Sequence, residues 1–442
     1  MKIAIAVLSL TVLTIGMPGS AQPGCCPNPG GEDYAPAWSP TGTLIAFTRF
    51  GQIDIGTFVV HPDGSGLKQV SGSTTFSWAP EGQRIVVGGG HLEIVDTDGR
   101  SLLQLTQGSY DAYPAWSPNG REIAFRRAGG AVWVIAAEGG PPKLLARDSP
   151  PRGRDVASRR ITWSPDGSRL AFVARRGPGN RGDDQIHVVA SDGTGERVLA
   201  GSKADEEEPI WSPNGTQIAF SSGLGRQRDV YVVHADGTKK VNVTSSRGWD
   251  GEPAWSPDGA TLSFEREAGL YLVPASGGAA RLLTRYGSPS HSAWSSDGSR
   301  LSFMGRGACL KWGIVVIPSS GGEPDLITND CYISGTNGND TIRGTLNRDI
   351  VHGGPGNDTI ALDAGNDEAW GDEGDDVILG GKGNDIIVGG SGRDSLFGGR
   401  GNDRLFTADG EVDNVSCGAR VDWVVADRLD HVASSCERVR RR

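Results

Sequence analysis

The sequence lacks several features that define large classes of proteins. It has seven His among 442 residues, scattered along the chain, whereas a catalytic metal site generally needs several that converge. It contains no G-x-S-x-G, so the nucleophile turn of α/β-hydrolase-type peptidases is absent. It has no stripe of Lys and Arg to neutralise phosphates, so nucleic acid is not an expected partner. These absences favour a binding protein over an enzyme.

Long apolar runs are missing after the first residues. The chain starts MKIAIAVLSLTVLTIGMPGSA, with a charged start, an apolar run and a small-residue end. This pattern predicts a secretory signal peptide over residues 1–21. A membrane anchor is the alternative, but the run from Ile3 to Ile15 is shorter than the roughly 20 residues needed to span. We therefore expect a secreted, extracellular protein, with the cell surface possible and no transmembrane segment after signal removal.

Acidic charge is present, and most of it is local. The formal net charge is −10. Residues 335–406 hold eleven Asp and two Glu against five Arg and one Lys, a net charge of −7. This concentration is typical of a segment that binds cations.

The same segment is a repeat of eight consecutive nine-residue units. Its clearest copies read GGPGNDTIA (353–361), GGKGNDIIV (380–388), GGSGRDSLF (389–397) and GGRGNDRLF (398–406). Aspartate fills the sixth place of every unit: Asp340, Asp349, Asp358, Asp367, Asp376, Asp385, Asp394 and Asp403. Two places later comes an apolar residue: Ile342, Val351, Ile360, Ala369, Ile378, Ile387, Leu396 and Leu405.

This period predicts a parallel roll in which two units make one coil. Glycines at places one, two and four permit positive φ and let carbonyl groups turn toward one point. Stacked coils lie about 4.8 Å apart, so alternate aspartates align. We name Asp340, Asp358, Asp376 and Asp394 the first Asp column, and Asp349, Asp367, Asp385 and Asp403 the second Asp column. Carboxylates stacked so closely repel unless a cation lies between them. Carboxylate and carbonyl oxygens together suit calcium.

The repeat resembles the RTX (hemolysin-type) calcium-binding nonapeptide GGxGxDxUx. The resemblance implies a β-roll that binds Ca²⁺ between successive turns and folds only with calcium. Its ligands would be the eight aspartates and main-chain groups at Gly338, Gly353, Gly354, Gly356, Gly380, Gly381, Gly383, Gly389, Gly390, Gly392, Gly398, Gly399 and Gly401. Four coils leave about three gaps in each column, and therefore about six ions at most.

Three units depart from the pattern. They have Asn347 at the fourth place, Leu362 and Asp363 at the first two places, and Asp372 at the second place. The site between Asp349 and Asp367 is therefore expected to be the weakest. A flexible glycine-rich linker is the alternative for the whole segment, but a linker requires neither the strict period nor the inward aliphatic residues.

A second repeat fills residues 33–328. Its markers are AWSPTG (37–42), SWAPEG (77–82), AWSPNG (115–120), TWSPDG (162–167), IWSPNG (210–215), AWSPDG (254–259) and AWSSDG (293–298). An apolar strand follows each marker, and the spacing is that of a four-stranded blade. The pattern resembles the TolB-type "WSPDG" β-propeller family, and seven markers favour seven blades. Trp, Pro and Gly of the marker have structural roles in turns and between blades.

The residues just before each marker are expected to line one mouth of the central channel. The best candidates for contact with a protein or peptide partner are Asp33, Asp111, Asp250, Glu252 and His291. The alternative, which the sequence favours equally, is that these residues form an ordinary solvated rim and bind no partner. The competing class is a secreted enzyme, a carbohydrate lyase or hydrolase-like protein. That class predicts a His/Glu/Gln or Ser/His cluster in the channel, and His291 is the only histidine on an expected inner strand.

The tail, residues 407–442, contains no full nonapeptide. Asp413 and Asp422 are nine residues apart, so the roll is expected to continue for a turn or two and then to be capped. Cys417 and Cys436 bracket this tail and are expected to pair. Cys309 and Cys331 bracket the end of the propeller region and are a second candidate pair. The alternative is that Cys25 and Cys26 pair with Cys309 or Cys331, because the first and last blades of a closed ring are neighbours.

Together these patterns predict an all-β protein with four segments. They are a signal peptide (1–21), a TolB-like propeller (33–328), an RTX calcium-binding roll (335–406) and a disulfide-stapled C-terminal cap (407–442). Calcium is the expected cofactor, and no catalytic residue is assigned.

Overall fold

The structure is a computed structural model. It describes residues 32–442 except for 52–54, 108–109, 128–129, 148–159, 176–183, 200–203, 225–226, 287, 307–311, 323, 329–330 and 345–347. The expected signal peptide, Cys25, Cys26 and Cys309 therefore lie outside the described residues, so the Cys309–Cys331 pairing is not described either. The chain divides into two units, one built on Pro27–Cys331 and the other containing Tyr332–Arg442. In the described part of the chain, no helix is long and apolar enough to cross a membrane.

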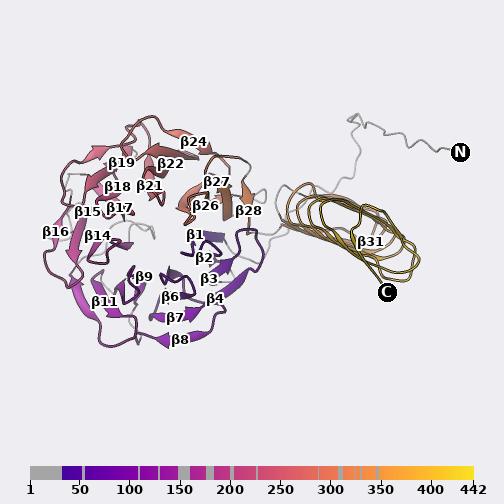
Figure 1. The fold of residues 1–442 in the computed structure, drawn as a ribbon, viewed down its shortest axis with the longest axis horizontal. Coiled ribbons are helices and arrows are strands. Elements are labelled where there is room, and N and C mark those ends of the chain that lie inside the picture. Colours follow the sequence, from indigo (N-terminus) through magenta and orange to yellow (C-terminus); the bar gives the residue numbers. More distant parts are fainter. Residues whose placement is uncertain are drawn as a thin grey trace. The chain divides into compact units, whose positions relative to one another are not determined.

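The first unit is a seven-bladed β-propeller, as the seven markers predict (Figure 1). Each blade is a four-stranded antiparallel sheet whose strands follow one another in chain order. The first four blades contain β1 (Glu32–Trp38), β2 (Ile45–Phe50), β3 (Ile55–Val60) and β4 (Lys68–Ser71); β5 (Thr75–Trp78), β6 (Arg84–Gly88), β7 (Glu93–Asp96) and β8 (Ser101–Gln104); β9 (Ala112–Trp116), β10 (Glu122–Arg126), β11 (Val132–Ala136) and β12 (Lys143–Ala146); and β13 (Ile161–Trp163), β14 (Arg169–Arg175), β15 (Asp184–Ala190) and β16 (Arg197–Val198).

Three further blades complete the ring. They contain β17 (Asp205–Trp211), β18 (Gln217–Leu224), β19 (Gln227–His234) and β20 (Val241–Asn242); β21 (Asp250–Trp255), β22 (Thr261–Arg266), β23 (Gly269–Pro274) and β24 (Arg281–Thr284); and β25 (Ser290–Trp294), β26 (Arg300–Arg306), β27 (Trp312–Pro318) and β28 (Asp325–Leu326). Phe47 and Phe58 of the first blade share one buried cluster with Ile314 and Val316 of the last. This packing closes the ring.

The repeated marker has the structural role that its residues predict. The marker glycines, such as Gly42 and Gly259, have φ of 71° and 70°, a conformation that favours glycine. The Trp78 and Trp255 indoles donate to the main-chain oxygens of Ala37 and Ile210 in the preceding blades, at 3.0 and 3.1 Å. These markers therefore turn the chain, and those with Trp78, Trp163, Trp255 and Trp294 also tie their blade to the one before it.

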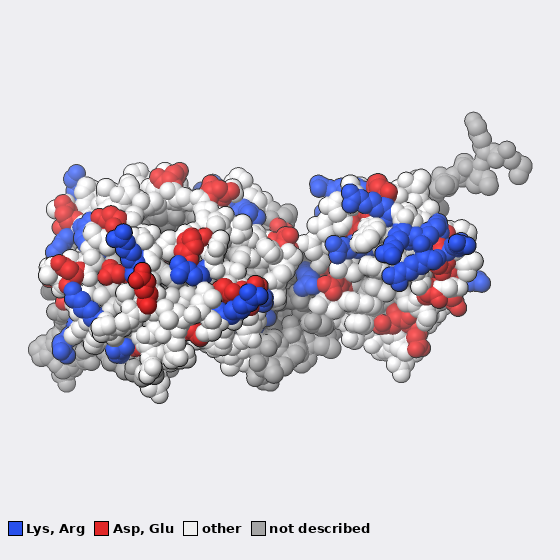
Figure 2. Space-filling view, turned by 60° about the horizontal axis from the view of Figure 1, so that its bottom comes forward, with Lys and Arg blue, Asp and Glu red and all other residues white. Residues whose placement is uncertain are grey.

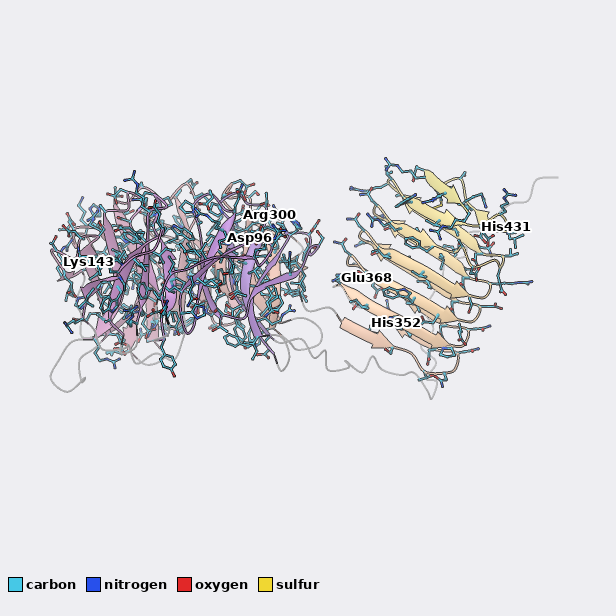
Figure 3. All side chains as sticks on the ribbon, turned by 90° about the horizontal axis from the view of Figure 1, so that it is seen from below. Asp96, Lys143, Arg300, His352, Glu368 and His431 are labelled. Atoms are coloured by element: carbon cyan, nitrogen blue, oxygen red, sulfur yellow. A yellow bond between two sulfur atoms is a disulfide. The ribbon has the colours of Figure 1, made fainter. Side chains whose placement is uncertain are left out.

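The second unit is a parallel β-solenoid with two sheets, whose strands are stacked as rungs in Figure 3. One sheet contains β29 (Cys331–Ser334), β31 (Asp349–Pro355), β33 (Glu368–Glu373), β35 (Ile386–Ser391), β37 (Arg404–Phe406), β39 (Trp423–Ala426) and β41 (Arg438–Arg441). The other contains β30 (Thr341–Arg343), β32 (Thr359–Ala361), β34 (Val377–Lys382), β36 (Ser395–Arg400), β38 (Asn414–Ala419) and β40 (His431–Val432).

The solenoid core is one ladder of aliphatic side chains. Every apolar residue expected to point inward is buried: Ile342, Val351, Ile360, Ala369, Ile378, Ile387, Leu396 and Leu405. Val415 and Val424 of the tail continue the same core. The tail thus extends both sheets through β38–β41, and the expected Cys417–Cys436 disulfide joins two of its buried residues.

Candidate metal centre

The aspartates of the roll form two hydrogen-bonded ladders. In each column the main-chain N–H of one Asp donates to Oδ1 of the Asp on the next coil. The first Asp column has N···O distances of 2.7 Å for Asp340–Asp358, 2.7 Å for Asp358–Asp376 and 2.9 Å for Asp376–Asp394. The second Asp column has 2.9 Å for each of Asp349–Asp367, Asp367–Asp385 and Asp385–Asp403. The stacking therefore fixes one oxygen of each carboxylate and leaves the other to be accounted for.

That second oxygen is buried without a partner. Among the residues that the structure describes, Oδ2 has no hydrogen-bond donor in Asp358, Asp367, Asp376, Asp385, Asp394, Asp403, Asp413 and Asp422. Burying a carboxylate oxygen without a hydrogen bond costs folding free energy, because the oxygen loses its hydration and gains no partner. Eight such oxygens recur on adjacent coils of the two columns, so the arrangement is a systematic feature of the roll. Each needs a proton or a cation.

Main-chain oxygens border the same space. A methyl group built on Gly380 would lie 2.6 Å from Asp385 Oδ2 and would also meet the carbonyl oxygen of Gly398 on the next coil. Gly353 repeats this arrangement with Asp358 Oδ2 and the carbonyl oxygen of Gly371. The first-place glycines thus leave room where carboxylate and carbonyl oxygens meet. An oxygen-only set of this kind fits Ca²⁺, which takes six to eight oxygen ligands.

Burial raises the pKa of these carboxyl groups. Together with the neighbouring carboxylates, which act in the same direction, burial raises the pKa of Asp367 to about 9 and those of Asp376 and Asp385 to about 7. The main-chain N–H bonds act in the opposite direction. A carboxyl group with a raised folded-state pKa stabilises the fold below its unfolded pKa, and this stability is lost as the pH rises through the folded value. At neutral pH the ion-free roll is therefore destabilised. A cation between the rungs would offset both the lost hydration of the carboxylates and their mutual repulsion.

Two further aspartates with a partnerless Oδ2, Asp413 and Asp422, extend the ladders beyond the eight regular units. Asp430 ends the first ladder, since its Oδ1 accepts the Asp413 N–H at 3.1 Å and its Oδ2 accepts the Thr407 hydroxyl at 2.9 Å. Asp394 N–H donates to Asp413 Oδ1 at 2.7 Å, and Asp403 N–H donates to Asp422 Oδ1 at 2.8 Å. Both steps are 19 residues long instead of 18, and this inserted residue hides them from a strict nine-residue search. The signal that remained was their own spacing of nine, each with a valine two places later.

The irregular units keep the ladder geometry. Asp363 and Asp372 stand at the second place and have φ of 62° and 74°. Aspartate tolerates this left-handed conformation better than most residues. The step from Asp349 to Asp367, expected to be the weakest, keeps its 2.9 Å hydrogen bond. Asn347 lies outside the described residues.

Three of the five residues expected to contact a partner are held inside the propeller. Asp33, Asp111 and Asp250 have no exposed surface. Each accepts two hydrogen bonds from an arginine on or just after the next strand, as does Asp250, which accepts from Arg266 Nε and Nη2 at 2.8 Å. Their charge is neutralised where they lie, so these side chains are not available to a partner.

The other two expected residues, Glu252 and His291, converge at the channel. Each occupies a bulge of an inner strand, with φ of 51° and 53°. The N–H of His291 donates to Glu252 Oε2 at 2.7 Å and to Glu265 Oε1 at 2.6 Å. Glu252, Glu265 and His291 each have a potential ligand atom within 4.8 Å of the others. Burial and the neighbouring Glu252 carboxylate raise the pKa of Glu208, beside this group, to about 7.

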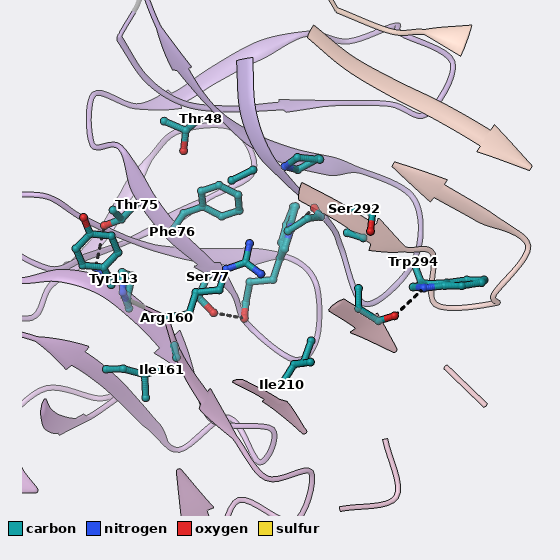
Figure 4. A pocket seen from close by; sticks show the side chains of 18 of the residues that line it. Thr48, Thr75, Phe76, Ser77, Tyr113, Arg160, Ile161, Ile210, Ser292 and Trp294 are labelled. Atoms are coloured by element: carbon teal, nitrogen blue, oxygen red, sulfur yellow. Dashed lines mark hydrogen bonds between the residues drawn. The ribbon is translucent and has the colours of Figure 1, made fainter. Parts of the chain in front are cut away.

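The central cavity of the propeller has a volume of about 480 Å³ (Figure 4). Phe76, Tyr113, Ile161 and hydroxyl groups such as that of Thr75 line it. Arg160 lines this cavity and also a small neighbouring one that contains Glu252 and His291. The channel therefore offers an apolar wall with one guanidinium group and one acidic cluster.

Comparisons with known proteins agree with both halves of the chain. The family described as "TolB beta propeller domain" matches residues 161–335. The family described as "RTX calcium-binding nonapeptide repeat (4 copies)" matches residues 334–369 and 370–405. The chain therefore carries a TolB-type β-propeller followed by RTX calcium-binding repeats.

The curated relatives match one part of the chain. The Tol-Pal system protein TolB of Anaeromyxobacter dehalogenans (strain 2CP-C) is 34% identical over 132 residues, which are 28% of this chain and 27% of that protein. The "Uncharacterized peptidase YuxL" of Bacillus subtilis (strain 168) is 28% identical over 26% of this chain and 22% of its own length. The match thus spans about a quarter of the length of these relatives.

Solved structures share the fold. An oligogalacturonate lyase in complex with manganese has a TM-score of 0.53 at 13% identity, over 66% of this chain and 91% of its own. Hydrazine synthase of Kuenenia stuttgartiensis has a TM-score of 0.53 at 15% identity, over 70% of this chain and all of its own. At such identities the likeness concerns the propeller architecture alone.

Proposed function

We propose that this is a secreted protein whose roll binds several structural calcium ions between stacked GGxGxD turns. The observation that carries the proposal is the row of buried, partnerless Oδ2 atoms in both columns. The ligands would be the eight sixth-place aspartates together with Asp413 and Asp422, and the main-chain oxygens of the turn glycines. Five rungs leave four gaps in each column, so at most eight ions would bind.

Calcium in these sites would couple folding of the roll to the calcium concentration of the surrounding compartment. Extracellular calcium modules bind at roughly 10⁻⁴–10⁻³ M, so the roll would stay unfolded inside a cell and fold outside. The binding energy of the ions would then be folding energy. The propeller would be a non-catalytic scaffold for a protein, peptide or other ligand, with Glu252 and His291, which line a small cavity beside the channel, as the residues that would contact that partner.

One carboxylate substitution tests the metal assignment. Asp376→Asn keeps the Oδ1 acceptor but removes a charged ligand shared by two gaps. We expect the calcium concentration at the folding midpoint to rise roughly tenfold, because affinity depends on the number of charged ligands. The measurement is a calcium titration of the full chain followed by circular dichroism.

The neighbouring Asp375→Asn is the matched control. Asp375 is exposed, and its Oδ1 accepts the N–H of Arg393 at 2.9 Å in the same way as Asn357 Oδ1 accepts the N–H of Asp375. An asparagine fits this outer ladder, so the midpoint should change by less than about twofold. Equal shifts for the two variants would show that overall charge, and not a metal ligand, sets the midpoint.

A second candidate function is carbohydrate cleavage at the channel. The observation that favours it is the convergence of Glu252, Glu265 and His291 within 4.8 Å. Under the scaffold proposal the wild-type chain does not cleave neutral or acidic oligosaccharides. A turnover that falls by about a hundredfold or more in His291→Gln, as loss of a general acid or base produces, would replace the scaffold by an enzyme.

A further inference from the structure

The two turn columns of the roll differ in the charge of their outer residues. Beside the first Asp column, the exposed turn residues include Glu373, Asp375 and Asp409. Beside the second, they are the cations Lys382, Arg400 and Arg420 on three successive coils. On the face seen in Figure 2, Lys and Arg side chains gather in a band across the roll. The roll segment 335–406 has a net charge of −7, but its turns beside the second Asp column present positive side chains.

The three cations line one groove. Its volume is about 360 Å³, and the Asn384 side chain lines it as well. Among the residues that the structure describes, none of the three cations makes an ion pair within 4.0 Å. The Asn384 Oδ1 accepts the Asn402 N–H at 2.8 Å, which leaves the amide N–H groups of Asn384 toward solvent. The groove therefore combines charged donors with a neutral one.

Arg420 occupies a place that other turns give to glycine. The corresponding residues on the two preceding coils are Gly383 and Gly401. Arg420 has a φ of 98°, a conformation that costs a residue with a side chain on the order of 1–3 kcal/mol. The positive charge at the end of the groove is thus kept at the expense of stability.

An exposed aromatic side chain lies on the same coils. Arg404, Trp423 and Arg438 are paired neighbours on β37, β39 and β41. Trp423 is 43% exposed. A tryptophan flanked by two guanidinium groups offers an apolar face beside charged donors, a combination typical of binding surfaces for amphipathic ligands.

We propose that this groove binds a linear polysaccharide that carries an acidic group on its sugars. The cations repeat with the coils, about 4.8 Å apart, which is close to the length of one sugar ring. An extended acidic peptide would present same-face charges about 6.8 Å apart, and the single exposed Trp423 gives no platform for stacking successive bases. Guanidinium groups suit carboxylates, and the Asn384 amide suits hydroxyl groups.

This inference rests on the proposed calcium binding, which would set the charge beneath the groove. The second Asp column, with Asp422, holds five carboxyl groups, whose charge reaches −5 when all of them are ionised and no ion is bound. With calcium in its four gaps the same column would carry +3. Electrostatic repulsion of a polyanion would thus turn into attraction. The groove would bind its ligand outside the cell, where calcium is abundant, and not before.

The test is fluorescence anisotropy of a labelled uronate hexasaccharide, too short to gel, with the full chain. We expect saturable binding in millimolar calcium, at least about a tenfold loss in K382Q/R400Q/R420G, and weakening by added salt, because exposed ion pairs are individually weak and screened. The matched single variants are R400Q, in the groove, and R393Q, an exposed arginine beside the first Asp column. R400Q should weaken binding about threefold and R393Q should leave it unchanged. R420G relieves a strained residue, and circular dichroism of the triple variant in calcium should show a folded roll, so that loss of binding is not loss of folding.

Circular dichroism in the same samples separates this inference from the calcium proposal. If calcium folds the roll but the hexasaccharide does not bind, or binds R393Q and R400Q equally weakly, the groove is not the site. If a neutral hexasaccharide or a short oligonucleotide binds as tightly, the ligand class is wrong. If calcium neither binds nor folds the roll, the proposed function itself fails.

Discussion

Chelation of calcium is expected to unfold the roll and to leave the propeller folded. In the ion-free state eight buried Oδ2 atoms have no partner, and burial raises the pKa of Asp367 to about 9. At neutral pH these groups must either ionise in place or take up protons, and both cost stability. The propeller has its own closed ring of buried clusters, such as the one around Phe47 and Ile314.

Hydrogen exchange followed by mass spectrometry measures the two units separately. With excess chelator, peptides from β31–β37 should lose their protection, whereas peptides from β2 or β18 should keep theirs. Adding calcium back should restore protection in the roll. Magnesium at the same concentration should not, because it demands near-ideal octahedral geometry and gives up its water reluctantly. Roll peptides that stay protected in chelator would contradict coupled folding.

The sequence predicts the roll well because one nine-residue period determines both its metal-ligand columns and its buried core. A nine-residue repeat fixes which residues share a column, so the aligned aspartates and the core from Ile342 to Leu405 follow together. The single inserted residue before Asp413 breaks the numerical period but not the stacking. A strict search therefore ends at residue 406, although β38–β41 continue both sheets.

The propeller is predictable as a fold but less so as a site. The seven markers identify seven blades, since each marker is a turn with its own residue requirements. The markers do not show which basic side chain pairs with an acidic residue that lies just before a marker. The arginines that bind Asp33, Asp111 and Asp250 each lie 16 residues later in the chain. That repeated spacing was the available signal, and it identifies these aspartates as buried ion pairs and not as a docking rim.

The Glu252, Glu265 and His291 cluster depends on geometry that no short motif encodes. The three residues come from β21, β22 and β25, and two of them reach the channel only because their strands bulge with positive φ. A bulge changes the face to which a side chain points. Alternation along the strand therefore cannot predict it.

The fourth-place glycines provide the strongest test of the stacked coils. Gly383 has a φ of 132°, and a methyl group on it would overlap the carbonyl oxygen of Gly365 on the preceding coil. Gly383→Ala should therefore destabilise the roll by about 4 kcal/mol or more, since it combines a disallowed backbone conformation with a steric clash. In saturating calcium, differential scanning calorimetry should show a large drop in the unfolding temperature of the roll and none for the propeller.

Gly338→Ala is the matched control, because Gly338 holds the same place in the first unit. A methyl group there meets only Thr336 Oγ1, at 4.0 Å, and its backbone has no positive φ. Its stability change should stay below about 1 kcal/mol. Both variants keep every carboxylate and carbonyl oxygen, so a difference between them reports coil stacking and not loss of a ligand. If the two variants melt alike, Gly365 and Gly383 do not lie one above the other, and neither do the calcium ligands that follow them in the same turns.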